Sequence, residues 1–276
     1  MLTIALPNKG ALHEGATAIF QEAGYRLRKD SRDLSFLDAK NGIEFFYLRP
    51  RDIATYVASG DLDLGVTGRD LLMDSGAAVT ERLGLDFGKS SFRFAAPSGT
   101  ADISGKRIAT SYPKLLGDYL NAKKLPASII ELDGAVEGAI KLGLADLIAD
   151  VVAAGNTLKQ AGLAIFGDVI MDSEAILISR DKYQNEEFDR LCRRLNGVVI
   201  ARQYVLVDYD IEEAKLEAAC GITPGLESPT ISPLKKVGWY AVRAMVKRNV
   251  VHEAMDQLWD IGARGILVTD IHSSRL

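Results

Sequence analysis

The segment from Lys141 to Leu163, KLGLADLIADVVAAGNTLKQAGL, constrains the fold more than any other stretch of the chain. Residues 145–152 are apolar except for two aspartates and run directly into small residues and a new helical pattern. This predicts a buried strand that feeds a helix through a tight loop. Such a loop lets an anion approach the backbone, and the first helical turn offers unpaired N–H groups. An ordinary strand-to-helix turn explains the pattern equally well, so the rest of the chain must decide.

Length and composition indicate a multidomain globular protein. With 276 residues, the chain can form two or three compact cores. A formal net charge of −4 and the lack of a basic tail argue against duplex nucleic acid as a partner. Pro7 and Lys9 come too early for the apolar region of a signal peptide, and no uncharged apolar run approaches the roughly 18 residues of a membrane helix. We expect a cytoplasmic protein that does not bind membranes.

Cysteine and histidine usage limits the chemistry that we expect. Cys192 and Cys220 lie far apart within helical patterns, as buried thiols of a reducing compartment do. With three histidines and no cysteine cluster, a structural zinc site or a histidine-based triad has little support. The reaction, if there is one, needs little help from imidazole or thiolate.

Residues 1–89 predict a first α/β lobe. A strand at residues 2–6 ends in the loop PNKG before a helix, and Asn41-Gly42 joins two strand-like runs in a hairpin. Pro50 opens a helix that Gly60 ends. The segment GDLDLGVTGRDLL then repeats the order of strand, small residues and helix found at 141–163, and this weak echo suggests two lobes of similar build.

The segment KSSFRFAAPSG predicts a strand that crosses into a second lobe, which we place at residues 90–179. Strand-like runs after Leu163 and a following helix return the chain, so that residues 180–203 complete lobe one. We expect the functional site in a cleft between these lobes.

The pattern changes for residues 204–276. It becomes β-α-β-β-α-β, provided that one short strand lies within the proline-rich link GITPGLESPTISPL. This predicts a separate ferredoxin-like domain, a module that more often binds a ligand or a neighbouring subunit than catalyses a reaction.

Several segments together resemble one enzyme family: PNKGAL, FFYLRPRDIATYV, LDLGVTGRDLL, SSFRFAAP, KRIATSYP, LDGAVEGAIKLGLADLIADVV, AGNTL and TPGLESPTISPL. In order, and over nearly the whole chain, they resemble ATP phosphoribosyltransferase in its long form, the first enzyme of histidine biosynthesis. The resemblance implies an α/β fold with a two-lobed catalytic region like a type II periplasmic binding protein, plus a C-terminal ACT-like regulatory domain. It also implies that N1 of ATP attacks C1 of phosphoribosyl diphosphate, that Mg²⁺-diphosphate leaves, and that free histidine inhibits.

That reaction needs no strong base, because N1 of adenine has a free lone pair, and it depends on positioning two polyanions. The resemblance implies that Asp150 lies near the ribose hydroxyls of the donor. It assigns the 5′-phosphate to a loop of five residues, Ala153, Ala154, Gly155, Asn156 and Thr157. Many members of the family have arginine where this chain has Asn156, so one side-chain cation is missing while the backbone donors remain. A buried acid bonded to a backbone amide is the competing interpretation of Asp150.

The remaining catalytic predictions concern charged residues near the expected cleft. The resemblance places Asp133 and Glu137 beside the diphosphate and Mg²⁺, although they could serve only as a helix cap and a solvated first-turn acid. For ATP we expect Lys9, Arg49, Arg69 and Asp70, with Tyr112 as an adenine neighbour. Among all these residues, the predicted catalytic ones are Asp150, Glu137, Lys9 and Arg49, and the metal ligands stay open.

In the C-terminal domain, we predict a histidine pocket formed by Asp210, Leu226, Ser228 and Thr230. The competing interpretation is that their segment is merely a linker stiffened by proline. Inhibition at a distance requires a second global state, most simply a change of subunit packing, and the resemblance implies dimers that assemble into hexamers when inhibited. The short form of the family lacks this domain and needs a partner protein, so residues 204–276 argue against that arrangement.

Two other functions fit parts of the pattern. A non-enzymatic solute-binding module would share the two-lobed architecture, but the expected lack of a signal peptide and the two anion-ready loops argue against it. An amino-acid-sensing regulator would keep the C-terminal domain, but no helix-turn-helix with a basic face is evident.

Overall fold

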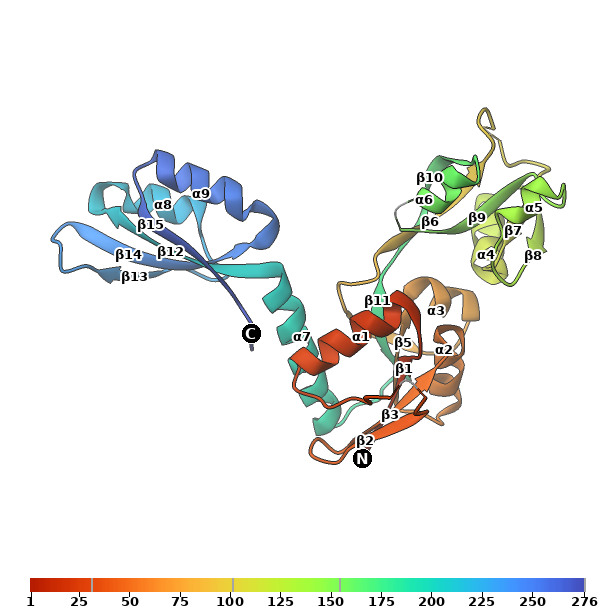
Figure 1. The fold of residues 1–276 in the computed structure, drawn as a ribbon, viewed down its shortest axis with the longest axis horizontal. Helices are drawn as coiled ribbons and strands as arrows, with labels where there is room; N and C mark the ends of the chain where they lie inside the picture. The colour runs from red at the N-terminus through yellow and green to blue at the C-terminus, as the bar shows by residue number, and fades with distance from the viewer. Residues whose placement is uncertain (31, 101, 154, 276) are drawn as a thin grey trace. The chain divides into compact units, whose positions relative to one another are not determined.

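The computed structural model describes residues 1–30, 32–100, 102–153 and 155–275 (Figure 1). The chain divides into two compact units. The first comprises Met1–Gln21 and Tyr25–Asp189, and the second comprises Glu22–Gly24 and Arg190–Leu276. The first unit contains two β-sheets, which we call lobe one and lobe two, and the second contains a third sheet.

Lobe one is built on a six-stranded sheet in the order β2-β3-β1-β4-β11-β5. Its strands are β1 (Leu2–Pro7), β2 (Ser35–Asp38), β3 (Ile43–Leu48), β4 (Leu64–Gly68), β5 (Thr80–Gly84) and β11 (Ala175–Ser179). The helices of this lobe are α1 (Gly10–Glu22), α2 (Pro50–Ser59) and α3 (Arg69–Ser75). β3, β1 and β4 are adjacent and run parallel, so their carboxyl ends meet at one edge of the sheet.

Several local predictions for lobe one are confirmed. β2 and β3 form the antiparallel hairpin. α2 begins at Pro50, where a missing backbone N–H breaks no helical hydrogen bond, and it ends at Gly60 in the left-handed conformation (φ 90°). The helix buries Ile53, Ala54 and Val57 against the sheet, and this apolar face fixes its position.

Lobe two is built on a five-stranded sheet in the order β10-β6-β9-β7-β8. Its strands are β6 (Ser90–Ala96), β7 (Arg107–Thr110), β8 (Ser128–Glu131), β9 (Leu147–Val152) and β10 (Ala164–Ser173), and its helices are α4 (Pro113–Lys123), α5 (Gly138–Lys141) and α6 (Asn156–Gln160). Alternating residues of the strands pack into two different hydrophobic clusters, one on each face of the sheet. Phe92 and Phe94 pack with Leu116 of α4, whereas Ala95 packs with Leu158 of α6. Helices therefore cover both faces of this sheet.

Two strands of lobe one differ from the sequence prediction. The sequence placed residues up to 179 in lobe two, but β11 pairs with β4 and β5 in the sheet of lobe one. The chain thus returns to lobe one at Glu174, between β10 and β11. β5 was not predicted, because its sequence TERLG has a single large apolar residue and no clear alternation.

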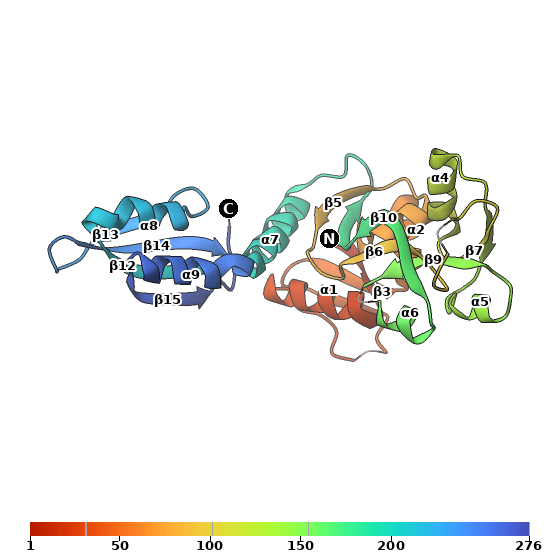
Figure 2. The ribbon, with the colours of Figure 1, turned by 90° about the horizontal axis from the view of Figure 1, so that it is seen from above.

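The second unit has the predicted β-α-β-β-α-β order. α7 (Glu186–Gln203) leads into β12 (Tyr204–Glu212), α8 (Leu216–Ile222), β13 (Thr230–Pro233), β14 (Trp239–Lys247), α9 (Val251–Asp260) and β15 (Arg264–Asp270), with short 3₁₀ turns at Glu213–Lys215 and Arg248–Val250. The antiparallel sheet has the order β13-β14-β12-β15, and β13 is the short strand expected within the proline-rich link. α8 and α9 lie side by side on one face of the sheet (Figures 1 and 2).

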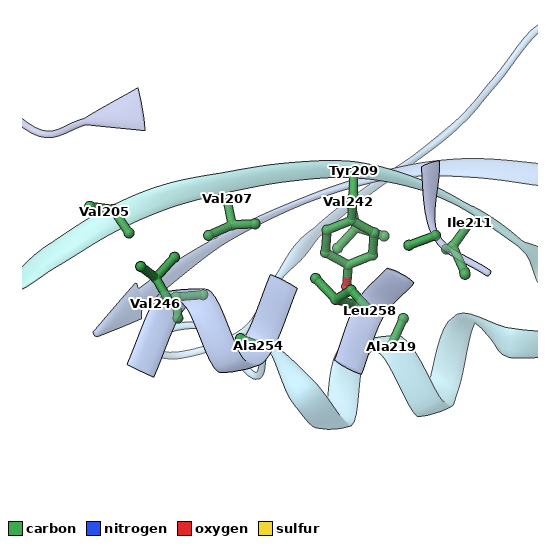
Figure 3. Close-up of a cluster of buried hydrophobic side chains, with 11 residues drawn as sticks. Val205, Val207, Tyr209, Ile211, Ala219, Val242, Val246, Ala254 and Leu258 are labelled. Atoms are coloured by element: carbon green, nitrogen blue, oxygen red, sulfur yellow. The ribbon is translucent and has the colours of Figure 1, made fainter. Parts of the chain in front are cut away.

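One face of β12 forms the core of this unit. Val205, Val207, Tyr209 and Ile211 point from the strand toward the two helices (Figure 3). The buried hydroxyl of Tyr209 is satisfied by a 2.8 Å hydrogen bond with Thr223 Oγ1. The opposite face of the sheet therefore carries the intervening, more polar residues.

Two further observations complete the fold. Cys192 and Cys220 are thiols, as expected, but both are half-buried rather than buried. Within the described part of the chain, no helix combines the length and the apolar character that crossing a membrane requires.

Candidate active site

The loop between β9 and α6 lines a cavity in lobe two. The first three residues of β9 are buried and the last three are half-buried, so the strand emerges from the core as it reaches the loop. The cavity has a volume of about 510 Å³ and is lined by Glu137, Asp150, Val151, Val152, Ala153, Gly155, Thr157 and Leu158. The structure thus brings together Glu137, Asp150 and three of the predicted loop residues. Ala154 and the side chain of Asn156 lie outside the described residues.

Gly155 gives this loop its shape. Its φ of +69° lies in the left-handed region, which favours glycine. A Cβ at this position would have room, because the nearest side-chain atom, Ile165 Cδ1, would lie 3.7 Å away. The requirement for glycine therefore comes from the backbone conformation and not from crowding.

Asp150 is a carboxylate that the fold holds away from water. Burial raises its pKa, a 2.7 Å hydrogen bond from the backbone N–H of Val151 lowers it, and the charge of Glu137 raises it again. The guanidinium of Arg51 lowers the pKa of Asp150, and the carboxylate of Asp70 raises it. The net effect is an increase in the pKa of Asp150, because burial and the two neighbouring carboxylates outweigh the Val151 N–H and Arg51.

Asp133 lies apart from this arrangement. It is exposed, and α5 begins only at Gly138, with Glu137 at the preceding position. The interpretation of Asp133 as a helix cap is therefore wrong. Its predicted role beside the diphosphate stays a prediction.

Lobe one contributes cations at the shared carboxyl edge of its parallel strands. Lys9 follows β1 and Arg49 follows β3, and both side chains are exposed. The ends of these two strands are tied together by a 2.9 Å hydrogen bond from Asn8 N–H to the Leu48 carbonyl. Arg28, which the sequence analysis did not single out, donates to the carbonyl of Asn8 (3.4 Å) at the same edge.

Arg69 and Asp70 follow β4, where both already have protein partners. The Arg69 guanidinium bonds to Glu81 (2.7 Å) and Glu174 (3.0 Å), which raise its pKa. Asp70 is 7% exposed, and the Ser173 hydroxyl donates to its Oδ1 at 2.6 Å. These contacts fasten the start of α3 to the segment where the chain crosses between the lobes. Their role in ATP binding stays a prediction.

Tyr112 connects the two lobes electrostatically. It precedes α4 in lobe two, and burial, together with the charge and hydrogen bonding of Asp70, raises the pKa of its hydroxyl. The guanidinium of Arg51, in α2 of lobe one, lies 4.8 Å from the centre of the Tyr112 ring. Since Arg51 also lowers the pKa of Asp150, it is a cation shared by both groups.

Arg51 is the residue that the sequence analysis missed. Arg49 and Arg51 flank Pro50, and the motif alone does not tell which of them faces lobe two. In the structure, Arg49 occupies the exposed position before α2, whereas Arg51 lies within its first turn and reaches Ser111 of lobe two. Because α2 begins at Pro50, Arg51 rather than Arg49 contacts lobe two.

These residues combine carboxylates, a cation and a phenol from the two lobes. Arg51 and Asp70 come from lobe one, and Tyr112, Glu137 and Asp150 come from lobe two. Across the residues that the structure describes, no three His, Cys, Asp or Glu side chains gather in a group that could hold a metal ion. The three carboxylates, the shared cation and the open backbone loop can bind a polar ligand that brings its own cation.

One cavity of the C-terminal domain contains one of the four residues predicted for the histidine pocket, and the pocket itself stays a prediction. Thr230 lines a cavity of about 210 Å³ together with Asp208, Ser232, Ala241, Val242 and Arg243. The predicted Asp210 lies on β12 two residues from Asp208, opposite Ala241. Leu226 and Ser228 lie in the segment between α8 and β13. The sequence analysis missed the Asp208–Arg243 ion pair (2.7 Å), because it joins strands that are far apart in the chain.

Comparison with known proteins adds independent findings. Residues 49–197 match the family model described as HisG, ATP phosphoribosyltransferase, and residues 201–273 match the model of the HisG C-terminal domain. A protein from Kocuria rhizophila named ATP phosphoribosyltransferase is 56% identical over 281 residues, which cover 100% of both chains.

Two solved structures resemble the chain. An ATP phosphoribosyl transferase (HisG:HisZ) complex from Thermotoga maritima contains a chain that is 29% identical, with a TM-score of 0.64 over 72% of this chain and 98% of that one. A histidine kinase sensor domain with similarity to periplasmic binding proteins has a TM-score of 0.50 at 11% identity, over 71% of this chain and 89% of that one. The second match shows a likeness of fold alone.

Proposed function

The chain belongs to the ATP phosphoribosyltransferase family, and from this premise we propose that it joins N1 of ATP to C1 of 5-phosphoribosyl 1-diphosphate, giving phosphoribosyl-ATP and diphosphate. This is the first step of histidine biosynthesis. The observation that carries the proposal is the cavity where Asp150 and Glu137 meet the small-residue loop after β9.

We assign the phosphoribosyl donor to that loop. Gly155 and Thr157 line the cavity and offer backbone amides and a hydroxyl to the 5′-phosphate, with the neighbouring residues of the predicted loop. Asp150 is placed to accept hydrogen bonds from ribose hydroxyls. Positive charge that develops at C1 during the transfer would be stabilised by Asp150 and Glu137.

We assign ATP to the carboxyl edge of lobe one. The exposed cations Lys9 and Arg49 would bind its phosphates, and Tyr112 would lie beside the adenine ring. Arg69 and Asp70 would act mainly by holding the start of α3 at this edge. Since N1 of adenine needs no deprotonation, these residues have to orient ATP rather than act as a base.

Mg²⁺ enters this proposal with the donor substrate. Magnesium ions in such sites are commonly held by one or two carboxylates together with substrate phosphates, and Glu137 and Asp150 both line the cavity. A bound Mg²⁺ would neutralise charge on the departing diphosphate. The carboxylates would orient the metal-bound donor and keep its C1 exposed to lobe one.

We propose that the C-terminal domain binds histidine and inhibits the enzyme. The cavity that contains Thr230 and the Asp208–Arg243 pair offers a carboxylate, a cation and hydroxyls to an amino acid. Asp210, Leu226 and Ser228 remain part of the proposed pocket. Inhibition would proceed through subunit packing, with dimers that assemble into hexamers. A cytoplasmic location, without nucleic-acid partners, also remains a proposal.

The test is a coupled assay for diphosphate release. We expect release only when both ATP and phosphoribosyl diphosphate are present, and inhibition by millimolar histidine. Lys9→Ala and Arg49→Ala should raise the KM for ATP by about tenfold each, the effect of losing one charged hydrogen bond. Lys40→Ala, which removes an exposed cation in the β2–β3 turn, is the matched control. Release with one substrate alone would contradict the proposed reaction, and unchanged kinetics in both test variants would contradict the ATP assignment.

A further inference from the structure

Asp74 of lobe one caps a helix of lobe two. α3 and α4 come from different lobes and pack against each other. The Oδ1 atom of Asp74 accepts hydrogen bonds from the backbone N–H groups of Lys114 (3.0 Å) and Leu115 (3.2 Å) in the first turn of α4. Such N–H groups have no partner within their own helix, and an N-cap side chain ordinarily satisfies them. The N-cap residue Tyr112 makes no such bond, so the cap comes from the other lobe.

Arg51 completes the same contact. Its Nη1 bonds to Asp74 Oδ2 (3.1 Å) and its Nη2 donates to the carbonyl of Ser111 (2.6 Å). Each oxygen of Asp74 is thus engaged, Oδ1 with α4 and Oδ2 with Arg51. The Asp74 side chain is 9% exposed and that of Arg51 is 41% exposed, so the contact is shielded from solvent on the Asp74 side only.

This contact adjoins the residue that joins the two halves of the site. Tyr112 lies between Ser111, which Arg51 holds, and Lys114, which Asp74 holds. The Tyr112 ring lies below the Arg51 guanidinium, and its hydroxyl is close enough to Asp70 for that carboxylate to raise its pKa. Arg51 and Asp74 both belong to lobe one, so separating the lobes would leave their ion pair intact. It would remove the cap of α4 and the Arg51–Ser111 hydrogen bond, and with them the placement of Tyr112.

We propose that Arg51 and Asp74 form a clasp between the lobes that holds Tyr112 over the bound nucleotide and stabilises the closed arrangement. Asp74 is a positioning residue, because it acts through α4 and Arg51. This inference rests on the proposed function, since it takes Tyr112 as a neighbour of adenine. It adds a specific consequence: the clasp should affect ATP more than the phosphoribosyl donor, whose loop lies wholly within lobe two.

The kinetic test compares Asp74→Ala with Asp118→Ala. Asp118 is an exposed acid of α4 that pairs with Lys114 through its side chain, so it controls for the loss of a charge on the same helix. We expect Asp74→Ala to raise the KM for ATP about tenfold, as for a lost helix cap, and to leave the KM for phosphoribosyl diphosphate within about twofold. Equal changes in both KM values, or kinetics like those of Asp118→Ala, would overturn the clasp.

A second readout does not depend on turnover. Amide hydrogen exchange at Lys114 and Leu115 should become about tenfold faster in Asp74→Ala, because their acceptor is lost, while amides of β4 keep their protection. Asp74→Asn keeps an acceptor oxygen but loses the charge, so the amides of Lys114 and Leu115 should keep most of their protection. This variant tests the clasp if Asp74→Ala does not fold. Unchanged exchange at both amides in Asp74→Ala would overturn the clasp even if the protein proved inactive with ATP. If the wild type released no diphosphate but Asp74→Ala still showed faster exchange than the wild type, the result would contradict the proposed reaction and leave the clasp intact.

Discussion

β4–α3 and β9–α6 follow one local plan and end in different chemistry. In both, a strand ends in small residues and a short helix follows. The aspartate lies in the helix at β4–α3 (Asp70) and in the strand at β9–α6 (Asp150). Every residue of β4 is buried, and the side chains after it are engaged: Arg69 with two carboxylates and Asp70 with Ser173. β9 loses burial toward its end, where Asp150 has a raised pKa and the loop lines a cavity.

The difference shows what distinguishes a structural strand end from a binding one. At β4–α3 the polar groups satisfy one another and fasten the crossing between lobes. At β9–α6 the fold half-buries a carboxylate, and the hydrogen bond from Val151 N–H does not offset the effect of burial on its pKa, which costs stability while the group is charged. The raised pKa of Asp150 and the cavity that it lines, more than the small residues alone, distinguish this loop from β4–α3.

The largest effect should come from Asp150→Asn. Removing the carboxylate should lower kcat by on the order of 100-fold, as for the loss of one preorganised group in a site. Asp146→Asn, an exposed acid just before the same strand, should leave kcat unchanged. Steady-state diphosphate release measures both, and a fully active Asp150→Asn would remove the basis of the comparison.

The same variant should be more stable than wild type at neutral pH. The folded-state pKa of Asp150 lies above its unfolded value, so the native state binds more protons in that window, and stability falls as the pH rises through it. Asparagine carries no such charge. Thermal unfolding should therefore give similar values for the two proteins below that window and a higher Tm for the variant above it. A lower Tm above it would show that Asp150 is a satisfied structural acid.

At β4–α3 we expect a loss of stability, in contrast to the gain expected for Asp150→Asn. Ser173→Ala leaves the buried Asp70 carboxylate without its hydroxyl donor and should destabilise the fold by about 1 to 3 kcal/mol. Ser75→Ala, which removes an exposed hydroxyl that donates to the Leu72 carbonyl and accepts from the Ala77 N–H, should cost less because no buried charge loses a donor. Urea unfolding compares the two. Equal costs would mean that the Ser173 hydroxyl does not stabilise the buried Asp70 carboxylate.

The smallest effect should come from Gly155→Ala. An alanine in the left-handed conformation should cost about 1 kcal/mol, since its Cβ has room. Gly117→Ala, with similar space but an ordinary helical backbone, should be neutral or stabilising. Urea unfolding measures the costs, and calorimetric titration with phosphoribosyl diphosphate should show weaker binding for Gly155→Ala alone. Donor binding unchanged by that substitution would argue against backbone recognition of the 5′-phosphate.

Local sequence patterns predicted much of this fold. The hairpin at Asn41-Gly42, the helix between Pro50 and Gly60, and the element order of the C-terminal domain are confirmed, because turn residues and apolar periodicity act over a few residues. The two-lobed fold and the family are also confirmed.

Long-range contacts account for what the sequence could not supply. β11 joins the sheet of lobe one through pairing with β4, more than 100 residues earlier, and its apolar run AILIS suits a central strand of either sheet. Arg51 and Asp74 are ordinary charged residues of helices until the other lobe is placed beside them. Asp150 was identified from the family resemblance, whereas the burial and the neighbouring charges that raise its pKa are visible only in three dimensions.

The most direct test of the account is calorimetric titration of phosphoribosyl diphosphate, with Mg²⁺ present, into wild type, Thr157→Val and Arg69→Lys. Thr157 lines the cavity after β9, whereas Arg69 begins α3 after β4 and is held by Glu81 and Glu174. We predict about tenfold weaker donor binding for Thr157→Val, the effect of one lost hydrogen bond to a charged group, and unchanged binding for Arg69→Lys. Weaker binding for Arg69→Lys with full affinity for Thr157→Val would contradict the assignment of the donor to β9–α6.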